Sequence, residues 1–261
     1  MKATTIAIVN LKGGVAKTTT TINVSYLLAS ELGKRVLVVD NDQQGNTSQF
    51  FGRYGYDHPG MSEVMKMRCT ADEAIQTTEH PRIDIIAANL SLAEAERAVL
   101  TDSVRPQQIR LKEVLQEVQH RYDYILIDNA PSLGMCVVNA LTASDCFLIP
   151  AKIDKWTFDG IGMLLEQART VRDYYNGALM FLGTLITSYR RTDINQQGAE
   201  WLAQAESYKT FDTMIRWTDK VDEATFTAEP IMVHSPRCGA TKDYRAFVEE
   251  LLRLLSESDI R

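Results

Sequence analysis

The chain has 261 residues, of which 45% are hydrophobic, and a formal net charge of −6 at pH 7. This length suits one α/β domain, and the apolar content is sufficient for a substantial core. No stretch approaches the roughly 18 apolar residues of a membrane span, and the amino terminus lacks a signal-peptide pattern. The acidic balance argues against a uniformly basic nucleic-acid binder but is compatible with a local basic patch. We expect one cytoplasmic domain spanning residues 1–261.

The cysteine pattern argues against a metal cluster or a disulfide framework. Four cysteines are widely spaced, and no two of them form a C-x-x-C pair: Cys69, Cys136, Cys146 and Cys238. One chain therefore offers no spacing typical of a zinc or iron–sulfur site. We expect buried or inert thiols in a reducing compartment.

The first predicted element is an apolar strand, residues 5–9, which runs into a glycine-containing turn and then a helix that begins at about Thr18. Backbone N–H groups of such a turn converge on an anion, and the helix dipole adds to them. Lys17 can reach the β- and γ-phosphates of a nucleotide, and the Thr18 hydroxyl can ligate Mg²⁺. The usual pattern GxxxxGK[ST] has glycine at both ends, where this chain has Leu11 and Ala16.

A second lysine, Lys12, precedes Lys17 by five residues. Two lysines beside a tight turn repel each other unless a phosphate neutralises them. The form KGGxxK[ST] resembles the deviant Walker A motif of the ParA/MinD family of P-loop ATPases. The resemblance implies that the following residues bind ATP: Lys12, Gly13, Gly14, Val15, Ala16, Lys17, Thr18 and Thr19.

The next strand, residues 35–39, ends in Asp40 and Asp42, which are separated by one residue. An aspartate in this place is often only a turn former or a helix cap. Alternatively, one carboxylate can hold the hydration shell of Mg²⁺ while the other orients the attacking water. The segment resembles switch I of the family, DxDPQGN, in which Asp42 matches the water-positioning carboxylate and Asp40 is left for the metal. Gln43 replaces the usual proline, which predicts a less rigid loop.

Farther along, a strand at residues 124–127 is followed by Asp128. Four apolar residues and an aspartate are typical of a Walker B strand, whose carboxylate binds Mg²⁺, often through water. The pattern is weak alone and strong together with the turn at residues 12–18. The segment also resembles YDYIIIDxPPSLG, with switch II at residues 131–134 and Ala130 in place of the first proline.

The remaining apolar runs alternate with amphipathic stretches. The additional strands are expected at residues 83–87, 146–149 and 181–186, with a shorter candidate at 213–215. The helices are expected at residues 18–32, 92–99, 107–120, 158–175, 194–205 and 244–256. Unalternated Val and Ile runs separated by helices predict a doubly wound, mostly parallel α/β sheet with helices on both faces. The aperiodic region 52–81 is expected to carry short surface helices.

The resemblance continues to the carboxyl end, through residues 148–160, 183–189, 221–231 and 239–244, and so spans nearly the whole chain. It is closest to the short ParA-type partition ATPases. It adds Thr187 and Arg216 to the expected ATP-binding residues. It also places four basic residues near family positions that bind DNA, namely Arg190, Arg191, Lys220 and Arg245.

The resemblance implies an ATP-dependent homodimer that uses ATP and Mg²⁺. In the family, the lysine matching Lys12 reaches the partner subunit's nucleotide, and the carboxylate matching Asp42 positions water, so these two are the expected catalytic residues. Thr18, Asp40 and Asp128 are the expected Mg²⁺ residues. The dimer is expected to bind DNA without sequence preference on the nucleoid, and a ParB-like centromere-binding partner is expected to stimulate slow hydrolysis.

Three alternatives remain. A MinD-like membrane regulator requires a basic amphipathic carboxyl-terminal helix, whereas residues 248–259 are acidic on their polar side, so no membrane binding is expected. A metal-cluster carrier requires paired bridging cysteines, for which Cys136 is the only candidate. A nucleotide-binding scaffold would bind ATP and scarcely hydrolyse it.

Overall fold

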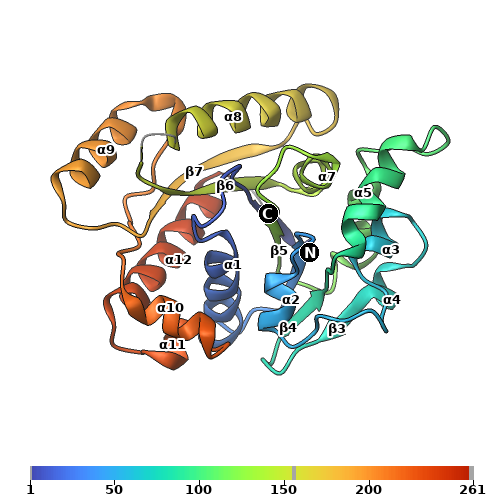
Figure 1. Cartoon of the computed structure of the whole chain (residues 1–261), viewed down its shortest axis with the longest axis horizontal. Helices are drawn as coiled ribbons and strands as arrows, with labels where there is room; N and C mark the ends of the chain where they lie inside the picture. Colours follow the sequence, from blue (N-terminus) through green and yellow to red (C-terminus); the bar gives the residue numbers. More distant parts are fainter. Residues whose placement is uncertain (1, 155–156, 259–261) are drawn as a thin grey trace.

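A seven-stranded sheet organises the computed structural model, which describes residues 2–154 and 157–258 (Figure 1). Across the sheet the strands follow the order β3-β4-β2-β5-β1-β6-β7. β3 pairs antiparallel with β4, and every other neighbouring pair is parallel. The strands are β1 Thr4–Ile8, β2 Val36–Asn41, β3 Ile75–Thr77, β4 Ile83–Ile86, β5 Tyr124–Asn129, β6 Cys146–Lys152 and β7 Met180–Thr187. The predicted doubly wound, mostly parallel fold is confirmed.

Helices connect successive strands except β3 and β4, and further helices follow β7. They are α1 Lys17–Tyr26, α2 Asn46–Phe50, α3 Met61–Met65, α4 Ala71–Ala74, α5 Ser91–Thr101, α6 Arg110–Val118, α7 Met135–Ala143, α8 Thr157–Tyr174, α9 Asp193–Gln204, α10 Asp219–Phe226, α11 Ile231–His234 and α12 Gly239–Glu257. A π-helical turn, η1 Leu27–Glu31, extends α1, and a 3-10 turn, η2 Glu206–Tyr208, follows α9. In Figure 1, α10, α11 and α12 lie beside α1.

Both faces of the sheet are covered, because alternate residues of one strand pack into different cores. On β1, Ile6 and Ile8 join a cluster that includes residues of α1 and α12. Ala7 and the following Val9 join a cluster with residues of α7 and α8 on the other face. Strands buried on both faces need apolar residues at consecutive positions, which explains the unalternated Val and Ile runs.

The segment 213–215 is not a strand of the sheet, although it lies along the edge. The N–H of Ile215 donates to the carbonyl of Ile186 at 2.8 Å, and the N–H of Tyr189 donates to the carbonyl of Ile215 at 3.0 Å. These bonds cover part of the outer edge of β7, which would otherwise leave backbone groups unpaired.

Two other expectations need correction. The region 52–81 does carry the short helices α3 and α4, but α3 is not at the surface, because Met61, Val64 and Met65 are fully buried. The last helix starts at Gly239 rather than at residue 244, since the Cys238 thiol accepts the N–H of Thr241 at its amino end. No helix in the described part of the chain is both long and apolar enough to cross a bilayer.

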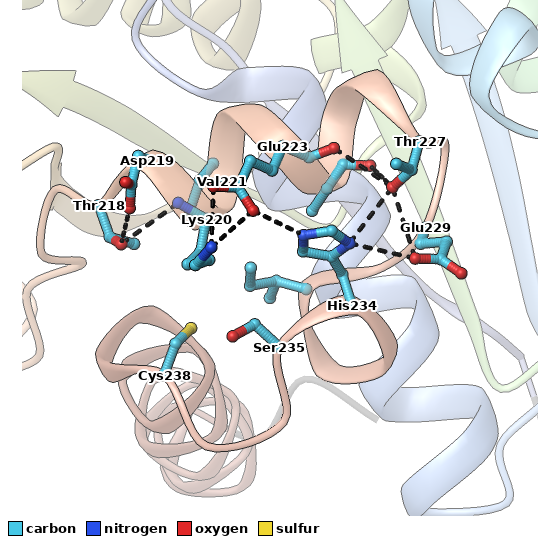
Figure 2. Close-up of polar contacts among 12 residues, drawn as sticks. Thr218, Asp219, Lys220, Val221, Glu223, Thr227, Glu229, His234, Ser235 and Cys238 are labelled. Carbon is cyan, nitrogen blue, oxygen red and sulfur yellow. Dashed lines mark hydrogen bonds and ion pairs between the residues drawn. The ribbon is translucent and has the colours of Figure 1, made fainter.

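Helices α10 and α11 are joined by a charged cluster centred on His234 (Figure 2). Its ring nitrogens lie 3.2 Å from Glu223 and 3.1 Å from Glu229, and Glu223 also pairs with Lys220 at 2.7 Å. Hydrogen bonds to Glu223 and then to Glu229 raise the pKa of His234 above 6.5. The imidazolium form therefore stabilises the folded state.

We expect His234→Gln to lower the melting temperature more near pH 6 than near pH 9. Because the folded pKa is raised, the contribution is fully present below the unfolded value and is lost as the pH rises through the folded value. Thermal melts at both pH values measure the difference, with the exposed His58→Gln as control. A loss that does not depend on pH would contradict the role of the charge.

Candidate functional site

The loop between β1 and α1 adopts a left-handed turn. Gly14 has φ +70° and Ala16 has φ 65° and ψ 31°. An alanine in this region costs about 1–2 kcal/mol, so Ala16 keeps the geometry of the glycine that it replaces at the expense of strain. A Cβ atom at Gly13 or Gly14 would meet none of the described residues within 4 Å, so the loop is open to them on that side.

The two lysines of the loop have different surroundings. Lys17 is only 7% exposed, and its Nζ donates to the carbonyl oxygen of Lys12 at 3.0 Å. Burial lowers the pKa of Lys17, while the charges of Asp128 and Asp42 act in the opposite direction. The Nζ of Lys12 instead forms an ion pair with Asp154, which follows β6. Lys12 is therefore held by its own chain in this structure.

Asp128 lies at the carboxyl end of β5 and is 1% exposed. Its Oδ2 accepts the hydroxyl of Thr18 at 2.7 Å and the hydroxyl of Thr47 at 2.6 Å, whereas its buried Oδ1 has no hydrogen-bond partner among the residues that the structure describes. Burial raises the pKa of Asp128 to about 6. A buried carboxylate oxygen without a partner, next to a hydroxyl, fits the oxygen ligands that Mg²⁺ prefers.

Asp40 lies directly opposite Asp128 in the pairing of β2 with β5 and is fully buried. Its Oδ2 accepts the N–H and the hydroxyl of Ser48 at 2.8 and 2.6 Å, and its Oδ1 accepts the N–H of Asp42 at 3.2 Å. Burial and the nearby Asp128 raise the pKa of Asp40 to about 8. Both oxygens of Asp40 thus already hold the loop that carries Asp42.

Asp42 is half-buried, and its Oδ1 accepts the N–H of Gln44 at 2.9 Å. It lines a cavity of about 200 Å³ between the switch segments, together with Glu96 of α5 and Ser132. The Oε1 of Glu96 accepts the N–H of Cys136 at 2.9 Å, at the start of α7. Residues 42–44 and 130–132 therefore face a common space.

The turn after Asp42 depends on glycine at position 45. Gly45 has φ +64°, and a Cβ there would lie 2.5 Å from the Tyr54 ring and 2.7 Å from the carbonyl oxygen of Ala88. We expect Gly45→Ala to lower the free energy of unfolding by about 2–4 kcal/mol, from strain and overlap together. Gly52 has φ +63° but open space around it, so Gly52→Ala should cost only about 1–2 kcal/mol. Urea unfolding measures both variants, and equal losses would contradict the overlap.

Thr187 and Arg216 meet the loop from the other side. Both line a cavity of about 250 Å³ together with Gly14 and Ala16. The Thr187 hydroxyl donates to the carbonyl of Val15 at 3.1 Å. The guanidinium of Arg216 forms a bidentate pair with Asp243, with both bonds at 2.7 Å. The structure thus brings these two residues beside the turn.

The four basic residues expected to bind DNA differ in their surroundings. Arg190 and Arg191 are exposed, and the Arg190 guanidinium stacks over Trp217, 3.9 Å from the ring centroid. Lys220 pairs with Glu223 at 2.7 Å, and Arg245 pairs with Glu31 at 2.7 Å. The charges of Lys220 and Arg245 are therefore partly compensated within the chain.

Three contributors were missed in the sequence. Thr47 and Ser48 hold the two strand-end carboxylates, and Asp154 holds Lys12. Thr47 and Ser48 could have been found in the sequence, because they are two consecutive hydroxyl residues that closely follow Asp40 and Asp42. Asp154 carried none, because it lies 142 residues from its partner.

Comparison with known proteins identifies the group to which this arrangement belongs. The profile of a family described as an AAA domain matches residues 3–181. The sporulation initiation inhibitor protein Soj of Bacillus subtilis (strain 168) is 36% identical over 248 residues, 94% of this chain and 97% of its own. The chromosome partitioning protein ParA of Caulobacter vibrioides is 31% identical over 251 residues, 95% of this chain and 93% of its own.

A solved structure has the same fold. It is cobyrinic acid a,c-diamide synthase from Mycobacterium smegmatis with a bound ATP analogue and magnesium, at a TM-score of 0.83 and 29% identity. The match covers 96% of this chain and 95% of that one. Together with the two relatives, which match nearly end to end, this similarity shows that the chain belongs to the ParA/MinD family of P-loop ATPases.

Proposed function

We propose that the protein is a ParA-type partition ATPase, which dimerises with ATP, binds DNA without sequence preference and hydrolyses ATP to drive plasmid or chromosome segregation. One observation carries the proposal. The buried Oδ1 of Asp128 has no partner in the described part of the chain, while Oδ2 of the same carboxylate accepts the hydroxyl of Thr18 at the start of α1. The full-length similarity to Soj and ParA supports the partition role.

ATP and Mg²⁺ are the cofactors. Residues 12–19 bind the phosphates through the backbone of the turn and through Lys17, whose buried ammonium already donates to the loop. Thr18 and Asp128 would hold Mg²⁺. Asp40 fixes the adjoining loop and would interact with the hydration shell of the metal. The bound metal supplies charge stabilisation for the transferring phosphoryl group. Thr187 and Arg216 border the nucleotide beside Gly14.

Lys12 and Asp42 are the catalytic residues. Asp42 orients the attacking water from the half-buried loop that its own backbone and Asp40 fix. Lys12 leaves Asp154 and reaches the nucleotide of the partner subunit, where a cation stabilises the charge that develops during transfer. Hydrolysis then requires the dimer.

Arg190 and Arg191 carry the DNA contact. Both are exposed, and the planar guanidinium of Arg190 is oriented by stacking on Trp217. Phosphate binding requires such cations on one face of the dimer. Lys220 and Arg245 contribute after exchanging their carboxylate partners for phosphate. The protein acts in the cytoplasm on the nucleoid, and a ParB-like centromere-binding protein stimulates it.

The Arg190→Ala/Arg191→Ala double variant should lose retention on DNA while it still dimerises with ATP. Removal of each arginine that contacts a phosphate should lower the magnitude of the salt slope of binding by about one. Binding to random-sequence DNA at several salt concentrations measures this, and light scattering checks the dimer. The Arg35→Ala/Arg53→Ala double variant, in the amino-terminal part of the chain, is the control that removes the same charge. Unchanged DNA affinity and salt slope in the double variant would contradict the assignment.

The alternatives have less support. The Cys136 thiol is buried, and burial raises its pKa well above the ordinary value of 9.0, so it is poorly suited to bridge a metal cluster. Co-sedimentation with anionic liposomes and ATP tests a MinD-like membrane regulator. A phosphate-release assay with DNA and partner tests the nucleotide-binding scaffold.

A further inference from the structure

Two hydroxyl groups hold the same oxygen of Asp128, and only one of them belongs to the phosphate-binding turn. Thr18 lies at the start of α1, whereas Thr47 comes from α2, the helix that follows the loop of Asp42. Thr47 is fully buried, and its bond to Oδ2 is 2.6 Å long.

We propose that Thr47 is a positioning residue for Mg²⁺: its hydroxyl fixes the Asp128 carboxylate with Oδ1 free for the metal, and it ties α2 to the bound ion. The inference rests on the proposed ATPase site. A carboxylate can rotate about its single bond and exchange its two oxygens. A hydroxyl that donates to Oδ2 alone removes this equivalence, and a buried donor cannot be replaced by solvent.

Thr47 is suited to this task because α2 is anchored independently. The adjacent Ser48 donates its hydroxyl to Asp40 at 2.6 Å and accepts the N–H of Ala88 at 2.8 Å. Asp40 and Asp128 are themselves register partners on β2 and β5. Consecutive residues of one short helix thus hold the carboxylates of two adjacent strands.

Thr18 is less suited than Thr47 to fix the Asp128 carboxylate, because Thr18 is also the proposed ligand of Mg²⁺. As a metal ligand it directs an oxygen lone pair to Mg²⁺, so its orientation is set by the ion. Thr47 lies outside the phosphate-binding turn, so its donation to Oδ2 does not compete with a contact to the nucleotide. It therefore preorganises the carboxylate, and it connects metal binding to the loop that carries Asp42 four residues before α2.

The test is the ratio of ADP affinities measured by calorimetry with Mg²⁺ and with EDTA. We expect Mg²⁺ to raise ADP affinity in the wild type, and Thr47→Val to reduce that gain about tenfold or more, as the loss of a group that orients a metal ligand does. ADP affinity in EDTA should change little. Thr47→Ser and Thr47→Ala form a second pair that differs only by the hydroxyl, and the serine variant should keep most of the gain.

Thr142→Val is the matched control. Thr142 is also a buried threonine, and its hydroxyl donates within α7 to the carbonyl of Val138 at 2.8 Å. It should keep the full Mg²⁺ gain. Thermal melts verify folding of every variant. The inference is overturned if the hydroxyl-free variants keep the wild-type gain, if serine is as poor as alanine, or if Thr142→Val loses as much. A wild type that binds ADP no better with Mg²⁺ would instead refute the proposed metal site, and the inference with it.

Discussion

Replacing Lys12 with alanine should lower steady-state ATP hydrolysis about 1,000-fold, the low end of what a cation supplied to the transferring phosphate contributes. The reason lies in the surroundings of Lys12. Its ammonium pairs with Asp154, whereas the Lys17 ammonium donates to a backbone carbonyl oxygen of the phosphate-binding turn. ADP binding by one subunit should therefore change little, and the loss should lie in the hydrolysis step.

Phosphate release and ADP binding measure the two effects separately. Lys2→Ala is a suitable control, because Lys2 is also a partly exposed lysine in an ion pair, with Asp145 at 2.6 Å. A Lys12→Ala protein that hydrolyses ATP at the wild-type rate would remove Lys12 from the mechanism.

Replacing Asp42 with alanine should lower hydrolysis by about 100- to 10,000-fold, the usual contribution of a group that directs proton transfer. ATP binding should persist, because Asp42 bonds to its own loop and does not belong to the phosphate-binding turn. The variant should therefore accumulate as a dimer in ATP and remain monomeric in ADP.

Light scattering after size exclusion, in ATP and in ADP, measures the oligomeric state. Asp57→Ala, which removes an exposed carboxylate from a nearby loop, should behave as the wild type. An Asp42→Ala protein that hydrolyses ATP normally, or that stays monomeric with ATP, would contradict the role assigned to Asp42.

Much of the sheet could be predicted because its strands carry a local signal. The run at residues 124–127 is apolar at consecutive positions, and the structure shows why: Ile125 and Ile127 face one core and Leu126 the other. Helix α7 was missed because its sequence, MCVVNALTA, is apolar on nearly all sides and buried at seven positions, so it has no amphipathic period. Helix α10 is short, and its only buried residue is Ala224, which leaves little periodicity to detect.

The site was predictable where residue type and chain position coincide. Lys17, Thr18 and Asp128 follow apolar strands or begin a helix, and parallel strands bring such positions to one edge. The bond between Thr47 and Asp128 spans 81 residues and depends on the docking of α2, which no local pattern specifies. The family, the fold and the ATPase class are established, whereas the roles of all individual site residues stay predictions, those of Lys12 and Asp42 included.

The central claim is that each subunit lends Lys12 to the nucleotide of the other, and mixing two inactive variants tests it most directly. Lys12→Ala and Asp42→Ala proteins are combined in equal amounts before ATP is added. A mixed dimer then has one complete site, formed by Asp42 of one subunit and Lys12 of the other. The account predicts that hydrolysis recovers to about a quarter of the wild-type rate, since half of the dimers are mixed and each has one working site. A mixture as inactive as its components, although mixed dimers form, would contradict it.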